Sequence, residues 1–158
     1  MNTQTFFQCF LTLHITGLTI MAGTTLVDYI TFKTFWKLFD KGKEKSAILL
    51  RAMSKFPMLI GVGAILTIGT GIGMMALTNG VFGEQLWFRI KFALVIILIL
   101  NGLLVGRRQG VKLQKIMNDN TANITQQINK VRSNLKIFHT SQLVIFFIII
   151  FLSVFKFN

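Results

Sequence analysis

Cysteine, proline and acidic residues are scarce in this chain, and their scarcity excludes several kinds of protein. Of the 158 residues, one is cysteine, one is proline, two are histidine and five are acidic. The single cysteine, Cys9, excludes an intramolecular disulfide and cannot build a thiolate metal site alone. The sequence has no HExxH or CxxC motif and no acidic cluster with metal-ligand spacing, and no Walker or GxSxG signature survives inspection. The glycine-rich GTGIG at 69–73 lies within an apolar span and does not open a soluble nucleotide-binding helix. The sequence therefore gives no sign of a zinc protease, a P-loop enzyme or a soluble hydrolase.

Apolar residues are abundant instead. Hydrophobic residues make up 53% of the chain, sixteen of them phenylalanine, and the mean hydropathy is +0.63, well outside the usual range of soluble domains. A bilayer core of about 30 Å needs roughly 20 helical residues to cross it. Four stretches are apolar over that length, at about 6–32, 56–78, 86–106 and 135–157. We predict an all-α integral membrane four-helix bundle that forms a single domain over residues 1–158.

Basic charge, a net +12, is concentrated at two of the connections between these spans. Seven Lys or Arg residues lie between the first and second spans, at about 33–55, and seven lie in or beside the connection at about 107–134. The positive-inside bias predicts that both basic loops face the cytoplasm and both termini face outside, in a bacterial inner membrane. Such loops are expected to contact anionic lipid, so we expect no nucleic-acid partner. The first apolar run is too long and too weakly charged at its start for a cleaved signal peptide, and we interpret it as a permanent helix.

Apolar residues continue at helical spacing into both basic connections. In the first connection they are Phe32, Phe35, Trp36 and Phe39, and in the second Ile124, Ile128, Val131, Leu135 and Phe138. This spacing predicts cytoplasmic helical extensions that are amphipathic and pack on one another. Turns are expected at Asp40–Gly42 and Asn118–Asn120, where the residue types tolerate turn geometry.

Other positions suggest how the spans are anchored and packed. Trp36 and Trp87, at the inner end of the first span and the outer start of the third, suit aromatic-belt anchors at the two membrane interfaces. Pro57 fits the first turn of the second span, where its missing N–H is no loss. Glycines recur along the second span, at Gly61, Gly63, Gly69, Gly71 and Gly73. They suit tight helix packing, a homodimer contact or a groove for a planar cofactor, and these interpretations stay open.

Ionisable residues inside the spans fall at two depths. With a rise of about 1.5 Å per residue, His14 lies roughly 12 Å and Lys91 roughly 8 Å below the outer surface. His139 lies roughly 8 Å from the inner face, and Asp28 is roughly 21 Å deeper than His14 on a similar helix face. We therefore predict an outer level with His14, Lys91 and Arg89, and an inner level with Asp28 and His139.

Charged groups inside a bilayer are costly, so each of these residues needs a reason to be there. Lys91 and Arg89 either snorkel to the outer interface or serve a buried site. Asp28 and His139 are interpreted as a structural pair. His14 is too deep and too short to snorkel, so it is either a satisfied neutral imidazole or a ligand or proton-transfer group. Imidazole is a good axial ligand for haem iron, and a four-helix membrane bundle can contain haem.

Two segments carry a resemblance to a known family. LHITGLTIMAG, residues 13–23, and LWFRIKFALVIILILNG, residues 86–102, resemble the HemJ family of four-helix membrane protoporphyrinogen IX oxidases and the related CopD-like families. The resemblance implies haem b held by His14, a catalytic role for His14 and Lys91, and cofactor contacts from Arg89 and Lys91. It also implies a hydrophobic tetrapyrrole substrate and a respiratory-chain electron acceptor. The segment VDYITFKTFWK, residues 27–37, departs from the family because it lacks the Pro-Arg and aromatic-His pattern.

Three hypotheses follow from the sequence. The first is a haem-b-binding inner-membrane redox protein that resembles HemJ, with protoporphyrinogen IX oxidation as the candidate reaction. The second is a non-enzymatic membrane subunit or CopD-like transport-related protein in which His14 and the seven methionines handle copper. The third is a structural membrane protein whose cytoplasmic helices dock a partner.

Overall fold

The computed structural model describes residues 2–118 and 124–155, and these residues are almost entirely helical. In chain order the elements are α1 (Thr3–Phe39), α2 (Lys43–Met53), α3 (Phe56–Leu77), the 3-10 helix η1 (Val81–Glu84), α4 (Leu86–Asn101), the π-helical segment η2 (Gly102–Gly106), α5 (Arg107–Asn118) and α6 (Ile124–Val154). The described ranges contain no strand. The all-α prediction is confirmed.

Four helical stretches are long and apolar enough to cross a membrane, and they correspond to the four predicted spans. They cover Thr3–Phe39, Ser46–Leu77, Leu86–Met117 and Gln126–Val154. Most of each apolar window is not buried within the protein, and large apolar side chains such as Ile15, Ile65 and Phe147 are exposed on the surface. An apolar surface of this extent fits lipid rather than water. The chain is built as a multi-pass membrane protein.

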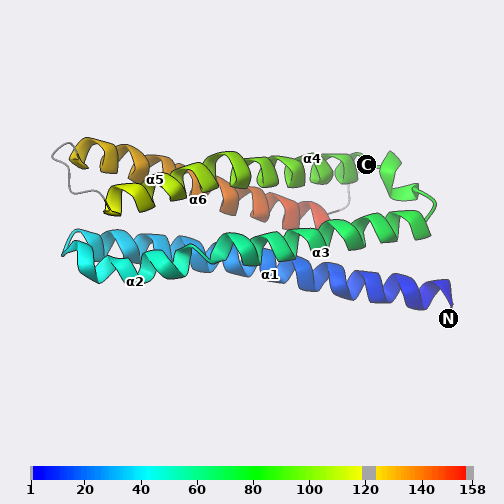
Figure 1. Cartoon of the computed structure of the whole chain (residues 1–158). Coiled ribbons are helices and arrows are strands. Elements are labelled where there is room, and N and C mark those ends of the chain that lie inside the picture. Colours follow the sequence, from blue (N-terminus) through cyan, green and yellow to red (C-terminus); the bar gives the residue numbers. More distant parts are fainter. Residues whose placement is uncertain (1, 119–123, 156–158) are drawn as a thin grey trace.

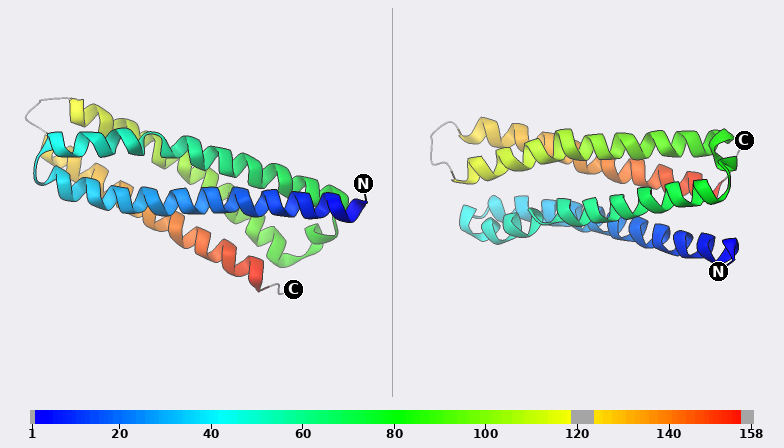
Figure 2. Two further views of the ribbon diagram at one scale, coloured as in Figure 1. Left: turned by 90° about the horizontal axis from the view of Figure 1, so that it is seen from below. Right: turned by 45° about the vertical axis from the view of Figure 1, so that its right-hand side comes forward.

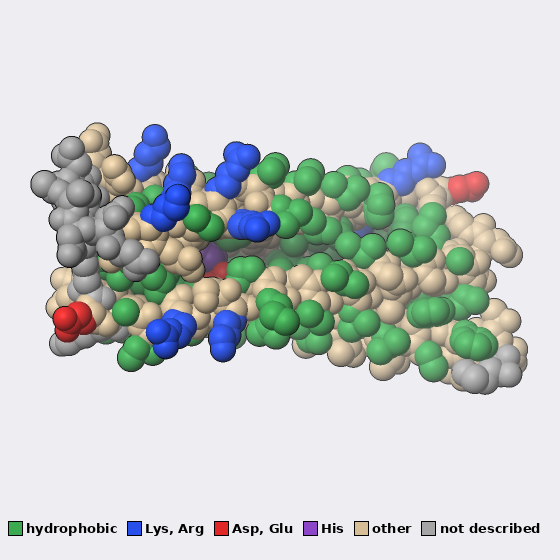
Figure 3. All heavy atoms as spheres, in the orientation of Figure 1, with side chains coloured by type: hydrophobic (Ala, Val, Ile, Leu, Met, Phe, Trp, Pro, Cys, Tyr) green, Lys and Arg blue, Asp and Glu red, His purple; other side chains and the backbone are tan. Residues whose placement is uncertain are grey.

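The helices form two side-by-side groups (Figure 1). Helices α1, α2 and α3 lie together, and α4, α5 and α6 lie along them. One end of the bundle, here called the terminal end, contains the start of α1, the end of α6 and η1 (Figures 1 and 2). The opposite end contains the turn at residues 40–42 and the start of α6. We call it the basic end because Lys and Arg side chains gather toward it in Figure 3.

Glycines bring α1 and α3 into backbone contact. A Cβ atom placed on Gly63 would lie 2.8 Å from the carbonyl oxygen of Gly17 and 2.9 Å from the backbone nitrogen of Met21. A Cβ atom on Gly17 would lie 2.7 Å from Thr67 Oγ1. Only glycine permits this approach, because any side chain would overlap the facing helix. The tight-packing interpretation of the second span is confirmed for Gly63.

The helical extensions pack on one another at the basic end, as the apolar spacing predicts. One core cluster joins α1, α5 and α6 there: Phe32, Phe35, Trp36, Leu113, Ile116, Val131 and Leu135. The predicted turn at Asp40–Gly42 is confirmed, and Gly42 adopts a positive φ of 148° that favours glycine. An Arg132–Asp40 ion pair at 3.3 Å connects this turn to α6. The other predicted turn, Asn118–Asn120, lies largely outside the described residues.

Both tryptophans are buried against protein, so their interpretation as lipid-interface anchors is wrong. Trp36 is 3% exposed and packs edge-on against Phe32 and Phe35, with the Arg132 guanidinium 5.0 Å from its ring centroid. Trp87 is 7% exposed. Sequence depth places a residue along a helix but not around it, and the rotation of both helices turns these rings inward. Pro57 lies in the first turn of α3, as predicted.

Candidate functional site

The outer polar level predicted from the sequence corresponds to a contact between α1 and α3. His14 is half-buried, and its Nδ1 lies 3.1 Å from Thr70 Oγ1. The Thr70 hydroxyl itself lies 2.6 Å from the carbonyl oxygen of Leu66 and 3.2 Å from that of Thr67, to which it donates. Because its proton is directed to a carbonyl, Thr70 Oγ1 accepts a hydrogen bond from His14 Nδ1–H. In the neutral ring, Nε2 then carries the lone pair.

Small residues of α3 make room for this imidazole. A Cβ atom on Gly71 would lie 3.3 Å from His14 Cε1, so glycine allows the ring to lie against the helix. Two residues further along α3, a Cβ atom on Gly73 would lie 3.0 Å from the ring of Phe10, so this glycine makes room for the Phe10 ring in the same way. The backbone of Thr67 also hydrogen-bonds the His14 ring. The orientation of the ring is therefore fixed by Thr67, Thr70 and Gly71 together.

A cation from the other helix group lies near this imidazole. The Lys91 ammonium, on α4, interacts electrostatically with His14. The depth estimate predicts this pairing, because the two residues lie at a similar distance from the same surface. Arg89 differs, since it is exposed and its Nε donates to the carbonyl oxygen of Gly83 at 2.9 Å, in the connection before α4. Lys91 is thus close enough to influence His14 electrostatically, whereas the Arg89 Nε is directed to the connection.

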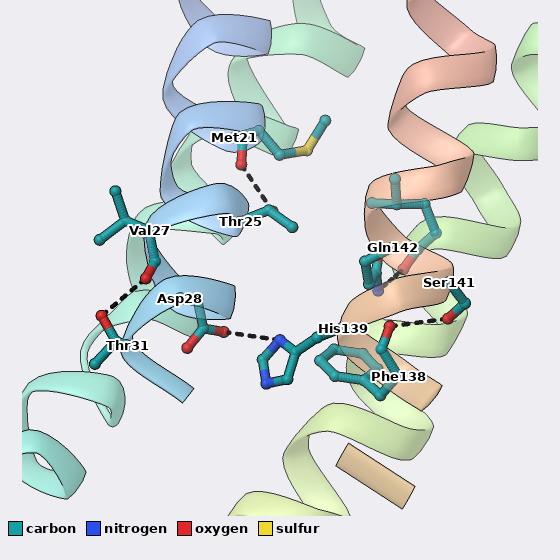
Figure 4. A network of polar contacts seen from close by, with 10 residues as sticks. Met21, Thr25, Val27, Asp28, Thr31, Phe138, His139, Ser141 and Gln142 are labelled. Atoms are coloured by element: carbon teal, nitrogen blue, oxygen red, sulfur yellow. Dashed lines mark hydrogen bonds and ion pairs between the residues drawn. The ribbon is translucent and has the colours of Figure 1, made fainter. Parts of the chain in front are cut away.

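The second polar level is a buried pair between α1 and α6. Asp28 Oδ2 lies 3.7 Å from His139 Nδ1, and Figure 4 shows the two side chains pointing toward one another. His139 is 3% exposed and lies between aromatic rings, with its ring centroid 4.7 Å from that of Phe32 and 5.1 Å from that of Phe138. The pairing of Asp28 with His139 predicted from the sequence is confirmed.

A cavity of about 440 Å³ adjoins this pair, between the two helix groups. Its polar lining includes Thr25, Asp28, Arg107, His139 and Gln142, and most of the other residues that line it are apolar. Figure 3 shows histidine and acidic atoms in the hollow between the groups. Sequence analysis did not single out Thr25 or Gln142. A signal was available for Gln142, because it follows His139 by three residues and such residues share a helix face.

Two side chains of the cavity lining have unpartnered polar atoms. His139 Nε2 and Gln142 Oε1 are buried and make no hydrogen bond with any of the residues that the structure describes. Gln142 does use its amide nitrogen, which donates to the carbonyl oxygen of Leu98 at 3.2 Å. Buried polar atoms without partners are uncommon and call for an explanation. The Asp28–His139 pair therefore leaves buried polar atoms of the inner level without a hydrogen bond.

The two histidines belong to separate sites. Asp28, which pairs with His139, follows His14 by fourteen residues on one continuous helix, or roughly 21 Å at the usual rise. One iron between both rings is therefore incompatible with this arrangement, as the sequence depths indicate. Within residues 2–118 and 124–155, no three His, Cys, Asp or Glu side chains gather at a site that could hold a metal ion.

These contacts also limit what each site can do chemically. The His14 level offers one imidazole nitrogen beside a cation, which suits a cofactor that brings its own metal ligands. The Asp28–His139 level offers hydrogen-bonding groups in an apolar cavity.

Comparisons of the chain with protein-family models, with curated proteins and with solved structures each give no match.

Proposed function

We propose that this chain is a haem-b-binding membrane redox protein in which His14 would hold the haem through its Nε2 atom. The observation that carries the proposal is the hydrogen bond between His14 Nδ1 and Thr70 Oγ1 at 3.1 Å. Metal-binding histidines usually donate their second ring N–H to an oxygen, which fixes the tautomer and the ring orientation. Thr70 supplies that oxygen, because its own proton is donated to a backbone carbonyl.

The donor set fits haem better than a bare metal ion. A free transition-metal ion needs several protein ligands, whereas the haem macrocycle provides four nitrogens and requires only axial ligands from the protein. One well-oriented imidazole therefore suffices. The Lys91 ammonium lies near enough to His14 to interact with it and suits a haem propionate, since ammonium–carboxylate hydrogen bonds are among the stronger ones.

The reaction we propose is the oxidation of protoporphyrinogen IX to protoporphyrin IX. The support is the resemblance of residues 13–23 and 86–102 to the HemJ family, together with the His14–Lys91 pairing. Haem b, when bound, supplies the electron acceptor in this scheme. Lys91 would hold a carboxylate of substrate or cofactor as an ammonium, or would assist proton removal as a neutral amine, while His14 and Thr70 would fix the geometry. We further propose a bacterial inner-membrane location with the basic end in the cytoplasm, and a respiratory-chain acceptor as partner.

The absorption spectrum of the purified protein tests this proposal. Protein purified in detergent from haem-replete cells is expected to show a Soret band and to contain about one haem per chain, as one axial site implies. Metal analysis of the same sample is expected to find iron and not copper, which separates this function from a copper-handling one. A colourless protein that also takes up no added haemin would disprove the proposal.

A further inference from the structure

The cavity beside Asp28 and His139 has the features of a ligand site that is separate from His14. Pockets for small molecules are typically about 300–1,000 Å³ in volume, mostly apolar, with a few polar groups that orient the ligand. This cavity has a volume of about 440 Å³ and is lined mainly by apolar groups, with polar side chains contributed by α1, α5 and α6. Its walls also include Gly102 and Gly106 of η2, and π-helical segments often occur at functional sites.

The unpartnered atoms define what a ligand must offer. Gln142 is 5% exposed, and its amide nitrogen donates to the Leu98 carbonyl, so its Oε1 is an acceptor in need of a donor. His139 is 3% exposed, its Nδ1 faces Asp28, and its Nε2 is unpartnered. A hydroxyl group satisfies Nε2 whether or not that nitrogen carries a proton, because a hydroxyl both donates and accepts. A carbonyl group cannot satisfy Gln142 Oε1, because it only accepts.

The placement of these atoms favours a ligand with two hydroxyl groups. His139 and Gln142 are three residues apart on α6, and side chains at that spacing lie on one helix face with Cβ atoms about 5–6 Å apart. Phe138 and Leu98 also line the cavity, which suits an aromatic ring between the polar contacts. The charged groups beside the cavity are of opposite sign, Asp28 of α1 and Arg107 of α5. Neither sign of charge on the ligand is therefore favoured, which suits an uncharged ligand.

We propose that this cavity binds a membrane-soluble hydroquinone in its reduced form, with one hydroxyl group donating to Gln142 Oε1 and the other hydrogen-bonded to His139 Nε2. The oxidised quinone has carbonyl oxygens in place of both hydroxyls and leaves Gln142 Oε1 unsatisfied. A buried acceptor without a donor is unfavourable, because it has lost its hydrogen bond to water and gained none in return. The site therefore discriminates between the two redox forms of one ring. This inference does not depend on haem binding at His14.

Three probes with the same ring test the proposal on the full-length protein in lipid nanodiscs. They are decylhydroquinone, decylquinone and the dimethyl ether of decylhydroquinone, titrated by calorimetry under anaerobic conditions. Decylhydroquinone is expected to bind saturably, and the quinone and the ether are expected to bind at least about tenfold more weakly, because neither can donate a hydrogen bond. Equal binding of all three, or no binding of the hydroquinone, overturns the proposal.

Two variants locate the binding within the cavity. Gln142→Leu removes the acceptor and is expected to weaken hydroquinone affinity at least about tenfold, whereas Ser141→Ala, one residue away, leaves it unchanged. Gly61→Leu places a side chain in the cavity without altering a polar group. The variant is expected to fold, because a Cβ atom at this position meets nothing within 4 Å. Loss of hydroquinone binding in Gly61→Leu supports the site, and unchanged affinity in that variant overturns it even if Gln142→Leu fails to fold.

Discussion

Replacing His14 by alanine is expected to remove the Soret band of the purified protein, whereas replacing His139 by alanine is expected to leave it in place. The His14 ring is oriented by Thr70 through Nδ1, so Nε2 is the nitrogen that faces a ligand. His139 lies roughly 21 Å away along the bundle, beside Asp28. Absorption spectra and haem content of the three proteins, at equal concentration and in one detergent, measure the effect.

A third variant separates a ligand role from a purely structural one. Thr70→Val retains the imidazole but removes the oxygen that accepts from Nδ1–H. Losing such a supporting partner typically lowers metal affinity by about 10- to 100-fold. We therefore expect weakened haem binding in Thr70→Val and no binding in His14→Ala. Loss of haem from His139→Ala but not from His14→Ala would contradict this assignment.

Replacing Gly63 by alanine is expected to destabilise the protein by about 1–3 kcal/mol, the usual range for overpacking a close contact. The added methyl group would lie within 3 Å of two backbone atoms of α1, and a backbone cannot rotate aside as a side chain can. Gly69 on the same helix provides the matched control, because a Cβ atom there meets nothing within 4 Å. Gly69→Ala is expected to be neutral or to stabilise α3 by up to about 1 kcal/mol, since alanine is the better helix former.

Thermal unfolding of both glycine variants in the same detergent measures this difference. The α1–α3 contact at Gly63 also sets how Thr70 faces His14, so Gly63→Ala is expected to weaken haem binding while Gly69→Ala does not. Equal melting temperatures for the two variants would show that the helices can separate at this point without cost.

The helices were largely predictable because hydropathy and helical spacing are local properties of the chain. The second span was predicted at 56–78, and α3 covers Phe56–Leu77. The third was predicted at 86–106, where α4 and η2 together end at Gly106. The first span runs beyond 32 to Phe39, which the apolar spacing of its extension indicates. The hydropathy pattern does not predict the π-helical segment η2 at Gly102–Gly106.

The depth of each site residue along its helix was predictable from the sequence, but the direction in which its side chain points around the helix was not. A fixed rise per residue places His14 level with Lys91 and sets Asp28 far from them, and the electrostatic interaction of Lys91 with His14 and the Asp28–His139 pair agree with this order. The choice of Thr70 as the His14 partner depends on the α1–α3 crossing at Gly63, which no single helix specifies. The interpretation of Trp36 as a lipid-interface anchor was wrong for a similar reason, because its packing against α5 and α6 depends on how separate helices assemble. The three-residue spacing from His139 indicates that Gln142 shares its helix face. The cavity itself depends on the space left between two helix groups, which the sequence does not specify.

The central claim is that the side chain of His14 acts as an imidazole ligand to haem iron, and chemical rescue tests it most directly. The His14→Gly variant leaves a space where free imidazole can replace the missing ring. We predict that this variant does not show the wild-type haem spectrum in the absence of imidazole. Added imidazole is expected to restore that spectrum in a saturable manner. A His14→Gly protein that shows the full wild-type Soret band without imidazole would place the iron ligand elsewhere and contradict the account.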